Sequence, residues 1–270
     1  MNNIFNLKGK VALITGGAGV LGGQMGEVLA QSGVNVGIMG LTLAEADIVT
    51  NRIIADGGKA FSVVANVLDK ESLEILRDEI IEKYGKLDIL INAAGGNMPG
   101  ATIAPDKAIY DMLTEDLQKV LNLNIIGTML PSQVFSEIFA KQRKGIIINI
   151  SSASATRPLT RVVGYSASKA AVDNFTKWMS VEMATKFGEG IRFNAIAPGF
   201  FIGEQNRALL LNPDGSLTPR GEKIIDQTPM KRFGVPEDLS GTLIWLCSDA
   251  SKFVTGISVN VDGGFGVSSI

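Results

Sequence analysis

Short apolar segments alternate with longer amphipathic segments along the whole chain of 270 residues, and this alternation constrains the fold more than any other feature. Near-continuous hydrophobicity in such short segments is typical of strands buried in a parallel sheet. We predict buried strands at Val11–Thr15, Val34–Met39, Ala60–Ala65, Leu87–Asn92, Gly145–Ile150, Ile191–Ile196 and Ile257–Val261. We predict helices at Leu21–Ser32, Leu43–Asp56, Lys70–Tyr84, Glu115–Lys141, Tyr165–Phe187 and Pro236–Ser248. The pattern favours the α/β class, with a doubly wound, seven-stranded parallel sheet in one domain over residues 1–270.

One segment departs from the alternation. Gly199–Arg232 separates the sixth predicted strand from the last predicted helix, and it contains Asn212–Gly215, a strong turn signal, as well as Pro219 and Pro229. Long connections inside compact domains are usually functional, so we predict that this segment forms a lid over a substrate site.

Histidine is absent, and Cys247 is the only cysteine. Ser-His-Asp hydrolysis, Cys-His proteolysis and His-ligated zinc sites are therefore excluded, and we predict no metal site. A single cysteine forms no internal disulfide, and the apolar run Leu243–Leu246 beside Cys247 predicts a buried core thiol. The net charge of −2 disfavours nucleic acid as a partner. Met1–Lys10 lacks a signal-peptide pattern and no segment is apolar enough to cross a membrane, so we expect a cytoplasmic protein.

A glycine-rich turn, Thr15–Gly22, joins the first predicted strand to the first predicted helix. Such a turn lets backbone N–H groups approach a pyrophosphate at the positive end of the helix, although a tight turn without a ligand is the alternative. The residues predicted to bind a dinucleotide here are Gly16, Gly19, Val20, Leu21 and Gly22.

The end of the second strand, where the adenosine ribose would be bound, reads Met39–Thr42 and offers neither a carboxylate nor a cation. No lysine or arginine occurs between Val11 and Asn51, and a 2′-phosphate there would lack a partner. We therefore favour NAD over NADP, with NADP still open, and include Leu41 in the cofactor site.

Tyr165 and Lys169 are four residues apart in a helical segment and so lie on one face of it. A lysine ammonium close to a phenol lowers the pKa of the tyrosine, which makes Tyr165 a candidate general acid or base. Ser151 and Ser152 follow a predicted strand, where open α/β sheets bind their ligands. The spacing of Tyr165 and Lys169 alone is a weak signal, but together with the glycine turn and Ser152 it becomes a strong one.

These residues resemble the short-chain dehydrogenase/reductase family along essentially the whole chain. The resemblance rests on Thr15–Gly22, Asn92–Gly95, Asn124, the Ser152, Tyr165 and Lys169 set, and Pro198-Gly199. It implies a Rossmann-type fold and hydride exchange between a nicotinamide and a small-molecule substrate. The cofactor-binding residues that it adds are Asn66, Val67, Asn92, Ala94, Gly95, Tyr165, Lys169, Pro198 and Gly199.

The resemblance also implies catalytic roles for four residues. Tyr165 would exchange a proton with the substrate oxygen, and Ser152 would hydrogen-bond that oxygen as charge develops. Lys169 would also hold the nicotinamide ribose, and Asn124 would position a water in the proton relay. The amide oxygen of Asn66 would accept a hydrogen bond from the adenine amine.

A narrower resemblance links the chain to the D-mannonate oxidoreductase (fructuronate reductase) subgroup of this family. It rests on Gly95–Asn97, Pro198–Phe201, Glu204–Arg207, Asn212–Gly215, Thr228–Met230, Arg232–Gly234 and Asp262–Phe265. A sugar-acid substrate needs a partner for its carboxylate, and Arg207 on the predicted lid is the first candidate. Arg157 and Arg161 are alternatives, and Asn97 is a candidate for a sugar hydroxyl, beside Ser152 and Tyr165.

Three functions stay open at this point. The first is an NAD(H)-linked enzyme for a keto sugar acid and its hydroxy acid, near D-fructuronate and D-mannonate. The second has the same chemistry on another carbonyl, such as 5-ketogluconate or a 3-oxoacyl thioester. The third is a dinucleotide-binding sensor without catalysis. The family resemblance further implies a homotetramer through the helices at Glu115–Lys141 and Tyr165–Phe187 and the final strand.

Overall fold

The computed structural model describes residues 3–268. They form one seven-stranded sheet in the order β3-β2-β1-β4-β5-β6-β7, and every neighbouring pair is parallel. The strands are β1 (Val11–Thr15), β2 (Asn35–Gly40), β3 (Lys59–Val64), β4 (Ile89–Asn92), β5 (Gly145–Ile150), β6 (Ile191–Pro198) and β7 (Ser258–Val261). The strand order reverses between β1 and β4, and open α/β sheets bind ligands beyond the carboxyl ends of such strands.

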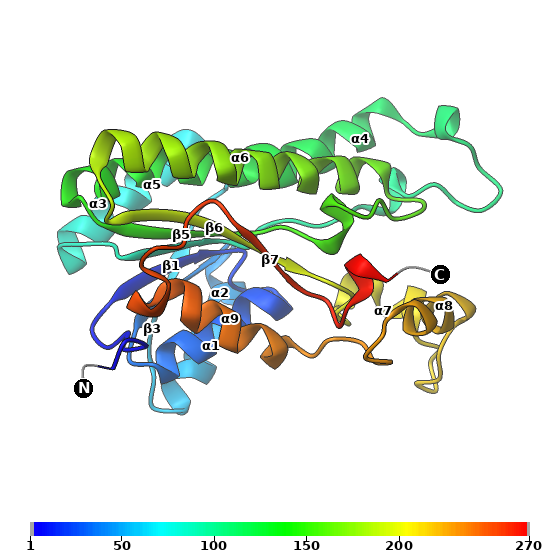
Figure 1. Cartoon of the computed structure of the whole chain (residues 1–270), viewed down its shortest axis with the longest axis horizontal. Helices are drawn as coiled ribbons and strands as arrows, with labels where there is room; N and C mark the ends of the chain where they lie inside the picture. Colours follow the sequence, from blue (N-terminus) through cyan, green and yellow to red (C-terminus); the bar gives the residue numbers. More distant parts are fainter. Residues whose placement is uncertain (1–2, 269–270) are drawn as a thin grey trace.

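Helices cover both faces of the sheet (Figure 1). They are α1 (Val20–Gln31), α2 (Leu43–Ala55), α3 (Lys70–Tyr84), α4 (Thr114–Leu121), α5 (Gly127–Gln142), α6 (Val163–Phe187), α7 (Glu204–Leu210), α8 (Pro219–Gln227) and α9 (Ser240–Cys247). Helices α1, α2 and α9 bury one apolar core against the sheet, and α3, α5 and α6 bury a second core on the other face. The predicted doubly wound α/β fold in one domain is thereby confirmed.

Most predicted strands and helices differ from the observed ones only at their ends, but the prediction of seven buried strands is wrong for two of them. The five central strands are almost wholly buried, whereas β3 and β7 are half-exposed. These two form the edges of the sheet, so each has only one neighbouring strand.

Two predicted helices are also interrupted. The helix predicted at Glu115–Lys141 consists of α4 and α5, which are joined by a π turn at Asn122–Ile126. The helix predicted at Pro236–Ser248 begins with a 3-10 turn at Pro236–Leu239, followed by α9. In each case the apolar pattern is continuous, while the backbone hydrogen bonding changes within it.

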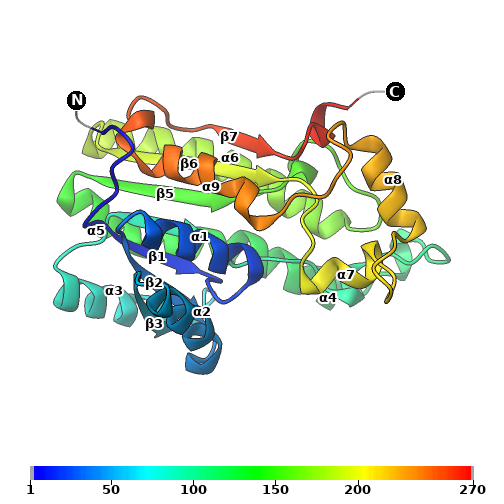
Figure 2. The ribbon, with the colours of Figure 1, turned by 90° about the horizontal axis from the view of Figure 1, so that it is seen from below.

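The excursion between β6 and α9 carries α7 and α8 and lies beyond the carboxyl ends of the strands (Figure 2). Helix α8 begins where the Thr218 hydroxyl accepts a hydrogen bond from Gly221 N and donates one to Leu209 O. Phe201, Leu210, Ile224 and Leu239 are buried apolar side chains of this segment. Within residues 3–268, no helix combines the length and the hydropathy that a membrane crossing requires.

Candidate active site

The glycine turn after β1 is built for close approach of a ligand to the backbone. Gly16 has φ +63°, and a Cβ there would lie 2.7 Å from the Cα of Ala94. Gly19 is the N-cap of α1 and supplies no side-chain cap, so the first N–H groups of the helix keep their capacity to bind an anion. A dinucleotide pyrophosphate fits this position.

A cleft of about 360 Å³ opens from this turn along the carboxyl edge of the sheet. Eleven of the residues predicted from the sequence line it: Gly16, Gly19, Val20, Leu21, Gly22, Gly95, Ser152, Tyr165, Lys169, Pro198 and Gly199. The cleft therefore brings the glycine turn and the candidate catalytic side chains into one continuous space.

The catalytic candidates are fixed by β5 and α6. Ser152 follows β5, and its Oγ accepts a hydrogen bond of 3.1 Å from Ser154 N. Tyr165 and Lys169 lie one turn apart near the start of α6, with Lys169 Nζ 5.5 Å from the centre of the Tyr165 ring. Lys169 Nζ donates a hydrogen bond of 2.7 Å to Ile150 O at the end of β5. The sheet thus holds the lysine while the helix holds the tyrosine.

Burial shifts the pKa of both groups. It raises the pKa of Tyr165, although a hydrogen bond with Ser152 partly opposes the shift. It lowers the pKa of Lys169 to about 8, opposed by the nearby carboxylate of Asp173. The sequence predicted a lowered pKa for Tyr165. The structure gives the opposite direction, because burial dominates and Lys169 Nζ lies over the ring rather than on the hydroxyl.

Asn124 lies in the π turn between α4 and α5 and is fully buried. Its Nδ2 donates to Val120 O, which is four residues earlier, and to Gly96 O, and its Oδ1 accepts from Gly96 N. The Asn124 side chain therefore hydrogen-bonds the Val120 carbonyl at the π turn, and its two bonds to Gly96 fix the loop after β4. A Cβ on Gly95 would lie 2.8 Å from Asn124 Oδ1, so glycine is required there.

Asn92 is buried behind the cleft rather than on its surface. Its Nδ2 donates to Ser132 Oγ and to Asn149 Oδ1, and Asn149 Nδ2 donates to Thr176 Oγ1. Each of these three hydrogen bonds is 2.8 Å long. This buried chain ties β4 and β5 to α5 and α6 just below the catalytic groups. Ala94, the next predicted residue, holds the same loop by donating from its N–H to Thr15 Oγ1.

The residues predicted for the adenosine end lie apart from the catalytic groups, beyond β2 and β3. Leu41 is 68% exposed at the end of β2, and Val67 is buried. Asn66 Oδ1 accepts a hydrogen bond from Leu68 N, which orients the amide. No lysine or arginine is found in this part of the chain between Val11 and Asn51, as noted from the sequence.

The substrate candidates lie in three different segments. Asn97 Nδ2 donates to Thr102 Oγ1 and Met98 O, while its buried Oδ1 has no partner among the described residues. Arg207 is exposed on α7. Arg157 is engaged with Phe265 O and Gln227, and Arg161 donates from Nε to Ile103 O.

Further residues that line the cleft were not among the sequence predictions for the site: Ala18, Ala93, Gly96, Ile150, Ser151, Phe201, Ile202, Gly203 and Asn206. Most of them adjoin predicted residues at the carboxyl ends of β1, β4, β5 and β6, which was the available signal. Asn206, whose side chain bonds Gly203 N and Phe201 O, lies in the predicted lid, where its signal was the neighbouring candidate Arg207.

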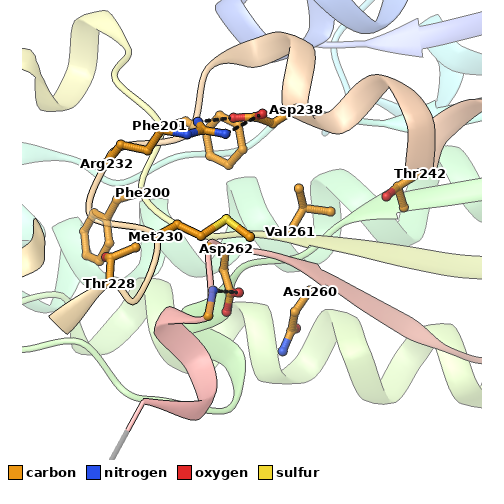
Figure 3. A pocket seen from close by; sticks show the side chains of 13 residues that line it. Phe200, Phe201, Thr228, Met230, Arg232, Asp238, Thr242, Asn260, Val261 and Asp262 are labelled. Atoms are coloured by element: carbon orange, nitrogen blue, oxygen red, sulfur yellow. Dashed lines mark hydrogen bonds and ion pairs between the residues drawn. The ribbon is translucent and has the colours of Figure 1, made fainter.

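A second hollow of about 410 Å³, also lined by Phe201, lies between the segment that precedes α9, α9 itself and β7 (Figure 3). The Arg232–Asp238 ion pair lies at one side of it, and the side chain of Met230 extends toward Val261. Asp262 is used within its own turn, where it accepts from Gly264 N and Gly266 N. This hollow contains none of the catalytic candidates.

Comparison with known proteins decides the family. The family model described as "Enoyl-(Acyl carrier protein) reductase" matches residues 17–266. The chain belongs to the short-chain dehydrogenase/reductase family. As a short-chain dehydrogenase/reductase it is an oxidoreductase, and the cleft with Ser152, Tyr165 and Lys169 is where the family resemblance places the reaction.

Three similar proteins illustrate the range of this family. The uncharacterized oxidoreductase UxuB of Bacillus subtilis is 48% identical over 269 residues, 96% of each chain. A Haemophilus influenzae protein, provisionally named a D-mannonate oxidoreductase and solved with bound NAD, is 40% identical with a TM-score of 0.91 over 99% of each chain. A gluconate 5-dehydrogenase from Burkholderia cenocepacia, in complex with NADP and tartrate, is 30% identical with a TM-score of 0.88 over 99% of this chain and 98% of that one.

Proposed function

We propose that this short-chain dehydrogenase/reductase interconverts a keto sugar acid and its hydroxy acid, with D-fructuronate and D-mannonate as the pair and NAD(H) as the cofactor. The observation that carries the proposal is the likeness over 99% of each chain to the Haemophilus influenzae protein, combined with a cleft that joins a glycine turn to Ser152, Tyr165 and Lys169. The end of β2, with Leu41 and without a cation, supports NAD over NADP.

The residues present fit a nicotinamide dinucleotide, which when bound supplies or accepts the hydride. The glycine turn and the start of α1 would hold the pyrophosphate, while Pro198 and Gly199 would border the nicotinamide. Lys169, held by Ile150 O, has two further N–H donors to offer to a ribose hydroxyl.

Tyr165 performs the proton exchange in this proposal. Burial keeps its phenol protonated at neutral pH, which suits the donation of a proton to the carbonyl oxygen during reduction. Ser152 Oγ hydrogen-bonds the same oxygen and stabilises the negative charge that develops on it. In the direction of oxidation, Tyr165 accepts the proton from the substrate hydroxyl.

The test is oxidation of reduced nicotinamide by the purified protein, with NADH and NADPH in parallel and three carbonyl substrates: D-fructuronate, 5-ketogluconate and an acetoacetyl thioester. Rapid loss of NADH with D-fructuronate alone is the expected result. Activity only with another carbonyl would overturn the substrate but leave the catalytic residues in place. Binding of NADH without turnover of any of the three would favour a sensor.

A second candidate is the same reaction on 5-ketogluconate, which the likeness to the Burkholderia gluconate 5-dehydrogenase favours. The description of the family model, an acyl-carrier-protein reductase, favours a thioester substrate in the same way. Both candidates keep Tyr165 as the proton donor, so the substrate panel above separates them.

We also propose a homotetramer, with a cytoplasmic location. Trp178 and Val181 on α6 are 59% and 67% exposed. Met230, which lines the hollow in Figure 3 near the edge strand β7, is 68% exposed. Large exposed apolar side chains in contiguous patches are typical of interfaces. Light scattering of the purified protein tests the assembly, and the mass of a monomer would refute it.

A further inference from the structure

Two arginines from distant parts of the chain come together at Thr160, in the segment that links Ser152 to Tyr165. Arg161 lies in the segment between β5 and α6, four residues before Tyr165, and Arg220 lies in the lid. The guanidinium of Arg220 reaches Thr160, with 3.4 Å to its Oγ1 and 3.5 Å to its carbonyl oxygen. Arg161 Nε donates a hydrogen bond of 2.9 Å to Ile103 O, and Ile103 N donates one to Arg161 O.

These contacts join three segments around one point: the loop after β4, the loop after β5 and helix α8 of the lid. The first two segments also carry Asn97 and Ser152, and they follow the central strands β4 and β5 rather than β2, where the adenosine would be bound. In Figure 2, α8 and the loop before α4 lie at the same end of the molecule, beyond the sheet.

Neither guanidinium forms an ion pair with any carboxylate among the side chains that the structure describes. Arg220 is also the second residue of α8, at the positive end of the helix dipole, where a cation is unfavourable. Burial and the charge of Arg161 both lower the pKa of Arg220. The arrangement concentrates positive charge without neutralising it.

The backbone of Arg161 adds a further cost. Its φ is +76°, in the left-handed region that residues with a side chain rarely adopt. Unfavourable backbone conformations and unneutralised charges cluster at ligand-binding sites, where a ligand compensates for them. Both costs point to an anion that is bound between the two residues.

We propose that Arg161 and Arg220 together bind the carboxylate of the sugar-acid substrate, a role that rests on the function proposed above. Arg220 uses its donors only at the limit of hydrogen-bond distance, and Arg161 uses only Nε, so planar N–H pairs remain for a carboxylate. Arg157 is less suited, because its two terminal nitrogens already bond Phe265 O and Gln227 Oε1. Arg207 is exposed on α7 and becomes a variant for comparison.

Because Arg220 lies on α8 and Arg161 in the segment before α6, a carboxylate bound between them also ties the predicted lid to the body of the protein. Substrate selection and closure then depend on the same negative charge. A neutral sugar with the same ketone would lack this interaction.

The experiment compares D-fructuronate with D-fructose, which carries a CH₂OH group in place of the carboxylate. The variants are Arg220→Gln, Arg161→Gln and Arg207→Gln, with Lys223→Gln, an exposed cation on the same helix α8, as the control. For Arg220→Gln and for Arg161→Gln we expect a loss of about 10- to 100-fold in kcat/KM for D-fructuronate. With D-fructose each variant should stay within about twofold of the unsubstituted protein.

Binding of D-mannonate, D-mannitol, D-gluconate and inorganic phosphate to the complex with NADH is measured alongside, with melting temperatures to verify folding. If Arg220→Gln keeps the preference for D-fructuronate over D-fructose, the inference is overturned while the proposed function stands. A stronger response to phosphate than to D-mannonate overturns it as well. If the protein does not reduce D-fructuronate, but Arg220→Gln weakens its binding of D-gluconate, the carboxylate site is supported and the proposed substrate is wrong.

Discussion

Lys169 Nζ donates a hydrogen bond of 2.7 Å to Ile150 O, so the ammonium group of an α6 residue is fixed on the end of the central strand β5. Its position is therefore set before any ligand binds. The same burial that fixes it also disfavours its charge, and this connects the geometry of the site to the pH of the reaction.

The rate of carbonyl reduction should fall as the pH rises through about 8, because burial lowers the pKa of Lys169 to about 8 and the reaction uses the ammonium form. The measurement is kcat/KM for the keto substrate from pH 6 to 10. Lys177→Met, an exposed lysine on the same helix, should leave the profile unchanged. A rate that stays flat up to pH 10 would contradict this role of Lys169.

Replacing Tyr165 by Phe should reduce turnover by about 10²- to 10⁴-fold, since the only proposed proton donor is removed. The ring and its packing are kept, so the dissociation constant for NADH, measured by fluorescence titration, should change little. If this variant retained most of its activity, the assignment of the proton donor would be wrong.

Gly95→Ala should impair catalysis, since the new Cβ would lie 2.8 Å from Asn124 Oδ1 and 3.2 Å from Lys169 Nζ. Gly241→Ala is the matched control, because a Cβ on this exposed position of α9 meets nothing within 4 Å. We expect that control to raise the free energy of unfolding by about 0.5–1 kcal/mol, as alanine is favoured in a helix interior. Equal activity of both variants would show that the space at Gly95 is unimportant.

Cys247 should resist thiol reagents in the folded protein. It is fully buried, and burial raises the pKa of its thiol to about 12, so almost no thiolate forms at neutral pH. Titration with an aromatic disulfide should give less than one reacting thiol per chain without denaturant and one in guanidinium chloride. Rapid reaction of the native protein would contradict the core position.

The sequence was sufficient for the fold, because buried parallel strands and amphipathic helices have distinct periods. It did carry a sign that β3 and β7 are edge strands, which the prediction of buried strands passed over: both contain a larger share of polar residues than the central strands, with Lys59 and Ser62 in β3 and Ser258 and Asn260 in β7. The π turn around Asn124 was hidden, because inserting one residue into a helical hydrogen-bond pattern leaves the apolar pattern continuous.

For the candidate site, the sequence could predict that the glycine turn, Ser152, Tyr165 and Lys169 share one cleft, because the turn and Ser152 follow strands whose carboxyl ends meet and Lys169 lies one helical turn from Tyr165. The meeting of Arg220 with Thr160 could not be predicted, since it depends on how the lid folds back across 60 residues of chain. The direction of the Tyr165 pKa was missed for a related reason: burial depends on the whole fold, whereas the charge of Lys169 is visible in the sequence.

The predicted lid is a single insertion between β6 and α9, and neither a strand of the sheet nor the glycine turn lies within it. Exchanging Arg207–Gln227, which follows the cleft-lining residues Gly199, Phe201 and Asn206, for the equivalent segment of a relative should thus alter which molecules are accepted without replacing the residues that border the nicotinamide. Because this segment is separate from the catalytic residues, evolution or protein engineering can change the substrate by changing one peptide segment while Tyr165 and Lys169 keep their positions.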